Sequence, residues 1–150
     1  MAGLVQIAAL LLQAAASDPS FAAVRALDHP DVVREGIVAE VIGLPPGVDR
    51  GEFAARVVEA EHLPSWNDGS MTSGEATGQL NYKSLTAGDG RGVVVYYSQD
   101  PGGPPTVCRL RTRQGGFTDA RYRALRWCAL QVGVLIPDEP GQPVAKRRSR

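Results

Sequence analysis

The sequence predicts an α+β fold, in which an antiparallel sheet of three to four strands is packed by two or three helices. Three short β-rich runs separated by turn sequences lie between residues 79 and 113. Segments whose apolar residues recur at helical spacing lie on either side of these runs, at 51–62 and 118–132. We therefore expect a meander of strands covered by the flanking helices.

The first half of the chain supplies two helices and one strand. Apolar residues at helical spacing predict a helix over 21–27. The β-branched run 36–42 predicts a strand that ends at the Pro-Gly turn of 44–47. Asp49 then caps a helix over 51–62, which Pro64 ends.

A loop and the meander follow. Residues 65–78 are rich in Ser, Thr, Gly and Asn without any period, so we expect a long loop, in which Trp66 is the most prominent side chain. The strands of the meander are expected at 79–85, 92–99 and 106–113.

Turn and cap residues mark the remaining boundaries. The pair Asp89-Gly90 suits the positive backbone angles of a tight hairpin between the first two strands of the meander. Thr118 or Asp119 caps the last helix, and Gly133 closes it.

The chain divides into three segments. Residues 1–16 carry no charge and combine an apolar stretch with a small-residue site before Ser17, which is typical of a secretory signal peptide. The alternative is a buried N-terminal helix of a cytosolic domain, because the start lacks Lys and Arg. The apolar stretch is too short for a membrane span. Residues 17–136 are expected to form a single domain, and residues 137–150 a disordered, Pro-rich basic tail.

The two cysteines are expected to form a disulfide. Strand alternation places Cys108 on the face opposite the arginines of its strand, and helical spacing places Cys128 beside the apolar stripe of the last helix. The two side chains therefore meet, and in an exported chain they are bridged. The alternative is a pair of buried thiols in a cytosolic core.

Arginines form the candidate binding surface. Arg109, Arg111 and Arg113 share one face of their strand and are expected to face water, where they bind anionic groups. The alternative is a solvated face without a partner. Trp66 in the expected loop is the second candidate contact residue.

Charge is distributed unevenly along the chain. Residues 1–75 hold four Arg against eleven Asp and Glu, whereas residues 76–150 hold twelve Lys and Arg against five acids. Either the two halves neutralise each other in the fold, which we favour, or one face attracts an anionic partner.

No established catalytic motif is present, and neither a cofactor nor a metal is expected. An enzyme stays an open alternative: a small hydrolase with an acid/His site near Glu59, His62 and Asp68, since such sites assemble in space. A further alternative is a cytosolic nucleic-acid-binding module, because the order of helix, three strands and helix superficially matches a double-stranded RNA-binding domain. Its expected basic helix start is only partly present, in Arg121 and Arg123.

Residues 91–132 resemble the C-terminal domain of TonB-type energy transducers. The resemblance rests on Gly92-Val93-Val94-Val95-Tyr96-Tyr97, a Gly/Asp turn, Val107-Cys108-Arg109-Leu110, Gly115-Gly116-Phe117, Asp119 and a helix with Arg-Ala-Leu-Arg-Trp. The Tyr-Pro entry, the Ser-Ser-Gly before the helix, the Pro-rich spacer and the membrane anchor of true transducers are missing. The resemblance implies a small periplasmic α+β domain whose exposed strand pairs with a segment of a partner.

Together these observations favour an exported, non-enzymatic binding domain of a bacterial-type cell envelope, periplasmic or secreted. Its expected partner is an envelope protein or an anionic envelope component, and nucleic acid is not the expected partner.

Overall fold

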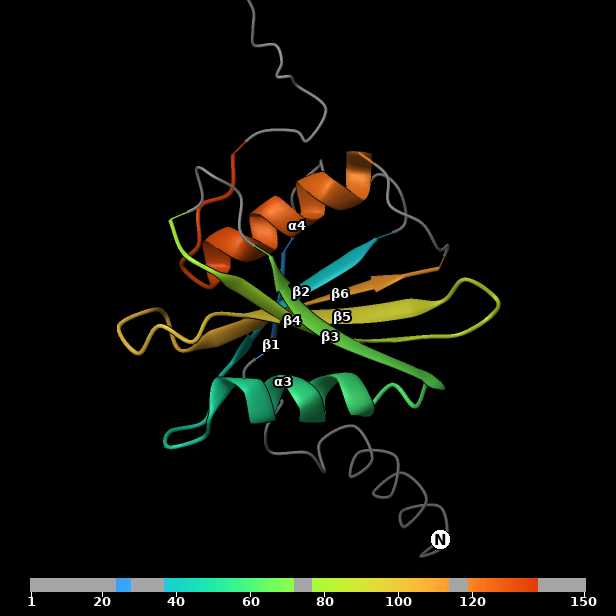
Figure 1. Ribbon diagram of the computed structural model, residues 1–150, viewed down its shortest axis with the longest axis horizontal. Coiled ribbons are helices and arrows are strands. Elements are labelled where there is room, and N and C mark those ends of the chain that lie inside the picture. The colour runs from blue at the N-terminus through green and yellow to red at the C-terminus, as the bar shows by residue number, and fades with distance from the viewer. Residues whose placement is uncertain (1–23, 28–36, 72–76, 114–118, 138–150) are drawn as a thin grey trace, which may run out of the picture.

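The computed structural model describes residues 24–27, 37–71, 77–113 and 119–137. These residues form one antiparallel sheet with a helix on each face (Figure 1). The α+β class is therefore confirmed, but the sheet is larger than expected, with six strands instead of three to four. The strand order is β1-β2-β6-β5-β4-β3, and every neighbouring pair is antiparallel.

The meander and the first strand lie close to where the sequence places them. The strand expected at 36–42 is β2 (Val38–Gly43), and the meander consists of β4 (Leu80–Thr86), β5 (Gly92–Tyr97) and β6 (Thr106–Thr112). In the hairpin between β4 and β5, Gly90 has a φ of 94°. A positive φ is the left-handed backbone conformation that the Asp-Gly pair predicts for this tight hairpin.

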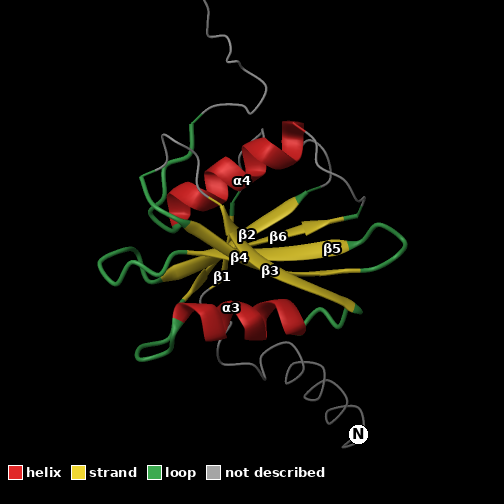
Figure 2. Cartoon of the chain, in the orientation of Figure 1, coloured by secondary structure: helices red, strands yellow, loops and turns green. Residues whose placement is uncertain are grey.

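Two strands stand where other structure was expected. Val24–Ala26 is strand β1 instead of part of a helix, and residues 21–23 of that expected helix lie outside the described part of the chain. Residues 65–71 of the expected loop form strand β3 (Ser65–Met71), while 72–76 are not described. Both are the edge strands of the sheet, and their inclusion accounts for its larger size (Figure 2).

Helix α3 (Arg50–Glu59) covers one face of the sheet. Asp49 is its N-cap and accepts a hydrogen bond from the backbone N–H of Glu52 at 3.0 Å, as the sequence predicts. The helix buries Phe53, Val57 and Val58 against Val93, Val95 and other residues of the central strands.

Helix α4 (Asp119–Gln131) covers the opposite face. It buries Leu125, Cys128 and Ala129 against the sheet, and Gly133, with a φ of 88°, ends it. Because both faces are covered, β5 has no water-facing position, and its sequence Gly-Val-Val-Val-Tyr-Tyr is buried throughout.

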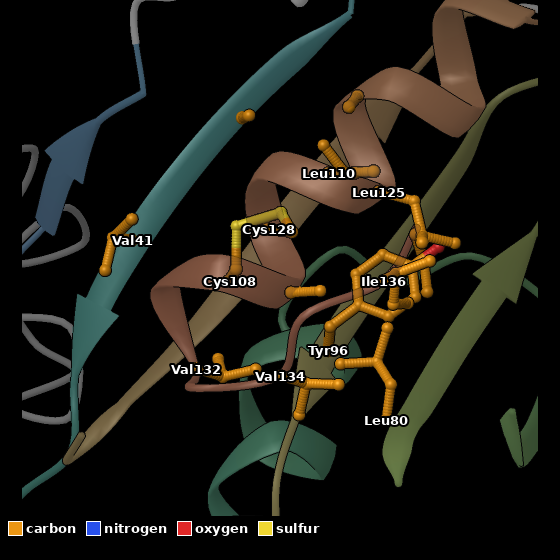
Figure 3. Packing of buried hydrophobic residues seen from close by; sticks show 14 of the residues in the cluster. Val41, Leu80, Tyr96, Cys108, Leu110, Leu125, Cys128, Val132, Val134 and Ile136 are labelled. Carbon is orange, nitrogen blue, oxygen red and sulfur yellow. A yellow bond between two sulfur atoms is a disulfide. The ribbon is translucent and has the colours of Figure 1, made fainter. Parts of the chain in front are cut away.

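The disulfide joins the α4 layer to the sheet. Cys108 on β6 and Cys128 on α4 are bonded, with their Cα atoms 5.3 Å apart, inside the core that also contains Val41, Leu110 and Tyr96 (Figure 3). The loop that it closes has a sequence separation of 20, for which the chain-entropy model gives about 3 kcal/mol of stabilisation. The segments expected to be a signal peptide and a tail, 1–16 and 138–150, lie outside the described residues.

Candidate functional site

The arginines of β6 lie on one face of the strand, but that face is covered by α3. Alternation places Arg109 and Arg111 on the side of Val107, whose side chain packs in the α3 core. Arg109 is only 5% exposed, and Arg111 is partly buried. The expectation that these arginines face water is therefore wrong for Arg109 and only partly right for Arg111. Arg113, beyond the end of the strand, is exposed.

Two carboxylates account for the burial of these charges. Glu40 lies directly across from Arg109 in the β2–β6 pairing and accepts hydrogen bonds from its Nε at 3.0 Å and from a terminal nitrogen at 2.7 Å. Glu61 binds Arg111 in a bidentate manner, at 3.1 and 2.9 Å. Arg111 also reaches Glu40 at 3.3 Å. A buried charge needs this kind of pairing, because leaving water without a partner is costly.

The network adds to the stability of the charged form of Arg111. Its hydrogen bonds to Glu61 raise the pKa of the Arg111 guanidinium against the opposing effect of burial, and the charge of Glu40 adds to the increase. Arg111 therefore remains a permanent cation at the edge of the α3 layer.

A left-handed turn brings Glu61 to the network. After α3, His62 adopts a φ of 56°, and its N–H donates to the carbonyl of Glu59 at 3.1 Å. The turn points the chain back toward the sheet, so that Leu63 packs against the α3 core before β3 begins. The position is one that glycine commonly occupies at a helix end.

A cleft of about 350 Å³ opens beside this network, at the end of the sheet where β6 finishes and β5 begins. Arg111 and Arg113 come from β6 and its end, and Arg91 comes from the hairpin before β5. The remaining lining residues are Val38, Glu61, Leu63, Gly92 and Thr112. We call this the arginine cleft.

Arg91 and Arg113 provide the accessible donors of the arginine cleft. Arg91 uses its Nε to bind Asp89 at 2.7 Å within the exposed hairpin. Hydrogen bonds from the backbone and side chain of Arg91 also lower the pKa of the Asp89 carboxyl. Within the described ranges, the structure shows no hydrogen bond or ion pair of Arg113. Arg113 is thus available to an outside anion.

Trp66 lies near one edge of the sheet and not in a loop. It is 46% exposed on β3, where it pairs with Leu85 of β4. The cross-strand register continues from Leu85 through Val93 to Arg111, so Trp66 shares the α3-side face with the arginine cleft but is separated from it by two strands. On the same strand, Asp68 binds Lys83 at 3.3 Å. Burial is the largest single effect on the pKa of Lys83 and lowers it, but the hydrogen bonds and charges of Asp68 and Tyr97 together outweigh it, so the net shift is upward.

The residues considered for a hydrolase are not combined into one site by the structure. Glu59 and His62 are exposed around the end of α3, and neither lines the arginine cleft. Asp68 is engaged with Lys83, and Glu61 with Arg111. In the part of the chain that the structure describes, no three His, Cys, Asp or Glu side chains are grouped as metal ligands would be.

Sequence reasoning missed Glu40, which pairs with Arg109, and Arg91, which lines the arginine cleft. The useful signal for Glu40 is a carboxylate on one strand and an arginine on another at positions that face the same way. This signal becomes readable only once β2 is known to lie beside β6.

None of the described helices is both long enough and apolar enough to cross a membrane. No family model, no curated protein and no solved structure matches this chain. The function proposed below therefore rests on the geometry and chemistry of the chain itself.

Proposed function

We propose that this chain is an exported, non-enzymatic interaction domain that binds an anionic group of a cell-envelope partner in the arginine cleft. The observation that carries the proposal is the meeting of Arg91, Arg111 and Arg113 around one cleft, with Arg113 exposed at its rim. Guanidinium groups recognise oxyanions through paired N–H donors, which gives such a site both affinity and orientation.

Export is supported by the disulfide and by the apolar start of the chain. Disulfides persist in oxidising compartments such as the periplasm and the cell exterior. The bridge between Cys108 and Cys128 fits this setting, and so does the signal peptide that the first 16 residues predict.

The ion pairs of the acidic side chains and the position of His62 favour binding over catalysis. In the described residues, Glu61 and Asp68 are each engaged with a cation, and His62 lies outside the arginine cleft. A general base needs a carboxylate or imidazole within reach of the reacting group, and the carboxylate that lines the cleft, Glu61, is already paired with Arg111.

The test is an NMR titration of the oxidised protein with sodium acetate and sodium phosphate, at an ionic strength held constant with sodium chloride. The methyl groups of Val38 and Leu63 are the reporters, because both side chains line the cleft. We expect saturable shifts with a Kd on the order of millimolar, as befits one or two charge-assisted hydrogen bonds to a small anion.

Matched variants locate the site. Arg113→Gln removes the exposed charge at the cleft and is expected to abolish saturation. Arg25→Gln removes the same charge from edge strand β1, where Arg25 binds Gln131 of α4, and is expected to leave the titration unchanged. Equal loss in both variants, or no saturation in the parent protein, refutes the proposal. Arg109 is unsuitable for this test because its substitution disturbs the ion-pair network of the fold.

A further inference from the structure

We infer that the ligand of the arginine cleft is a carboxylate attached to an apolar group, such as a chain terminus that ends in an aliphatic residue or a small aliphatic acid. The inference rests on the proposed function and specifies the chemical class of the anion. It follows from the charge count of the cleft, from the donors of Arg91 and Arg113, and from the apolar part of the lining.

The charge count leaves room for a single negative charge. Four guanidinium groups belong to the cleft and its supporting network: Arg91, Arg109, Arg111 and Arg113. Three carboxylates, Asp89, Glu40 and Glu61, accept ion pairs from the first three of them. Among the described residues of this set, one positive charge therefore remains unbalanced, and it is located at Arg113. A carboxylate balances that charge, whereas a phosphate dianion adds a second negative charge close to Glu61, which also lines the cleft.

The N–H groups of Arg91 and Arg113 that make no hydrogen bond to the described residues suit a carboxylate. Arg91 binds the side chain of Asp89 through its Nε, and its terminal nitrogens make no hydrogen bond to the described residues. Arg113 contributes a second guanidinium from the end of β6. Two oxygens of one carboxylate can accept from two such groups.

The apolar part of the lining explains why the carboxylate carries an aliphatic group. Val38 is 48% exposed at the start of β2, directly across from Arg111 in the strand pairing, and Leu63 lies on the same cleft. An aliphatic side chain placed against Val38 and Leu63 removes their apolar surface from water while the carboxylate meets Arg113. A fully hydrated anion leaves that surface exposed.

The experiment compares four probes by the same NMR titration: acetate, phosphate, N-acetyl-leucine and N-acetyl-leucine amide. N-acetyl-leucine is expected to bind about tenfold more tightly than acetate, because it covers part of the apolar lining. The amide, which keeps the side chain but lacks the charge, is expected to lose saturable binding. Phosphate is expected to bind no more tightly than acetate.

A conservative variant tests the apolar wall of the cleft. Val38→Thr keeps a β-branched side chain but adds a hydroxyl to the apolar wall. It is expected to reduce the advantage of N-acetyl-leucine over acetate while acetate binding is retained.

The outcomes distinguish the inference from the function on which it rests. Stronger binding of phosphate than of N-acetyl-leucine, or equal binding of the amide and the acid, overturns the inference but leaves an anion site. Absence of binding by all four probes overturns both. A short peptide that ends in leucine distinguishes a chain terminus from a small aliphatic acid as the ligand. If the peptide binds at least as tightly as N-acetyl-leucine, the ligand is a chain terminus. If the added residues of the peptide abolish binding, the ligand is a small acid.

Discussion

At the scale of single residues, the pairing of Arg109 shows how a charged side chain becomes part of a core. The strand alternation that buries Val107 also buries Arg109, and Glu40 on the neighbouring strand supplies the opposite charge. Such a pair does not by itself prove a stabilising role, because desolvation offsets much of the attraction. Breaking it is costly all the same, because one charge is then left buried without its partner.

We predict that Arg109→Met lowers the free energy of unfolding by about 3 kcal/mol, since Glu40 loses its shortest ion pair. Urea denaturation followed by circular dichroism measures the change. The control is Arg56→Met on the exposed side of α3, which should change stability by less than about 0.5 kcal/mol. A loss at Arg109 no larger than at Arg56 would mean that the network does not support the fold.

Tyr96 gives a pH dependence with a defined sign. Burial on the α4 side of the sheet raises the pKa of its hydroxyl, and the positive charge of Arg121 opposes the increase. In the unfolded chain, tyrosine ionises near pH 10. Above that pH the unfolded state binds fewer protons than the folded state, so stability falls as the pH rises.

We predict that this alkaline loss of stability is smaller in Tyr96→Phe than in the parent protein. Urea denaturation between about pH 9 and 11 measures it, and the pH range below gives the baseline where the group contributes nothing. Tyr122→Phe serves as the control, because its hydroxyl bonds the carbonyl of Pro137 in a part-buried setting. Parallel curves for the parent and the Tyr96 variant contradict the account.

At the scale of elements, the central strands and both flanking helices follow from the sequence, whereas the edge strands do not. The central strand β5 and the apolar stripe of α3 have strong local patterns because each must fill a core. Edge strand β3 is exposed along most of its length, so its sequence shows no alternation. Its polar, Gly-containing composition predicts a loop, and pairing with β4 decides otherwise.

Edge strand β1 illustrates the same competition on the other side of the sheet. Val24 and Leu27 stand at helical spacing, which predicts a helix. In the structure, however, Val24–Ala26 pairs with β2, and the N–H of Leu27 donates to Ala39 at 2.8 Å. A short segment has weak intrinsic preference, so pairing with an existing strand outweighs it.

The end of α3 carries a testable backbone strain. His62 holds a φ of 56°, where a side chain is unfavourable and glycine is not. We predict that His62→Gly raises the free energy of unfolding by about 0.5 to 1 kcal/mol. His62→Ala also removes the imidazole but keeps the Cβ, so it should bring no gain. Thermal unfolding of both variants decides the point, and equal effects would assign the change to the lost imidazole.

At the scale of the whole molecule, the acidic first half and the basic second half meet in the fold. Glu40 and Glu61 come from the first half, and Arg109 and Arg111 from the second. The sequence favours such mutual neutralisation, and these ion pairs follow that expectation. It does not reveal which arginine stays available, because that depends on the position of β2 beside β6 and on the turn after α3. Of the sequence-derived candidates, Arg111 and Arg113 line the arginine cleft, whereas Arg109 supports it.

If the chain is exported, the mature protein should differ from the full-length chain in its location, its first residue and its mass. Expressed in a host with an active secretory pathway, the chain should be recovered outside the cytoplasm with Ser17 as its first residue. Its intact mass should be two hydrogens below that of the dithiol form, because Cys108 and Cys128 are bonded. Alkylation before and after reduction provides the control. A full-length chain with two alkylatable thiols in the cytoplasm would contradict export.

The position of a bound carboxylate in a crystal tests the anion site at the arginine cleft most directly. Crystals of the oxidised protein soaked with 4-bromobenzoate combine a carboxylate with an apolar ring that carries an anomalous scatterer. We expect a bromine peak beside Val38 and Leu63, with the carboxylate in contact with Arg113. A bromine peak only elsewhere on the molecule, or an arginine cleft left empty by the soaked acid, would rule out this carboxylate site.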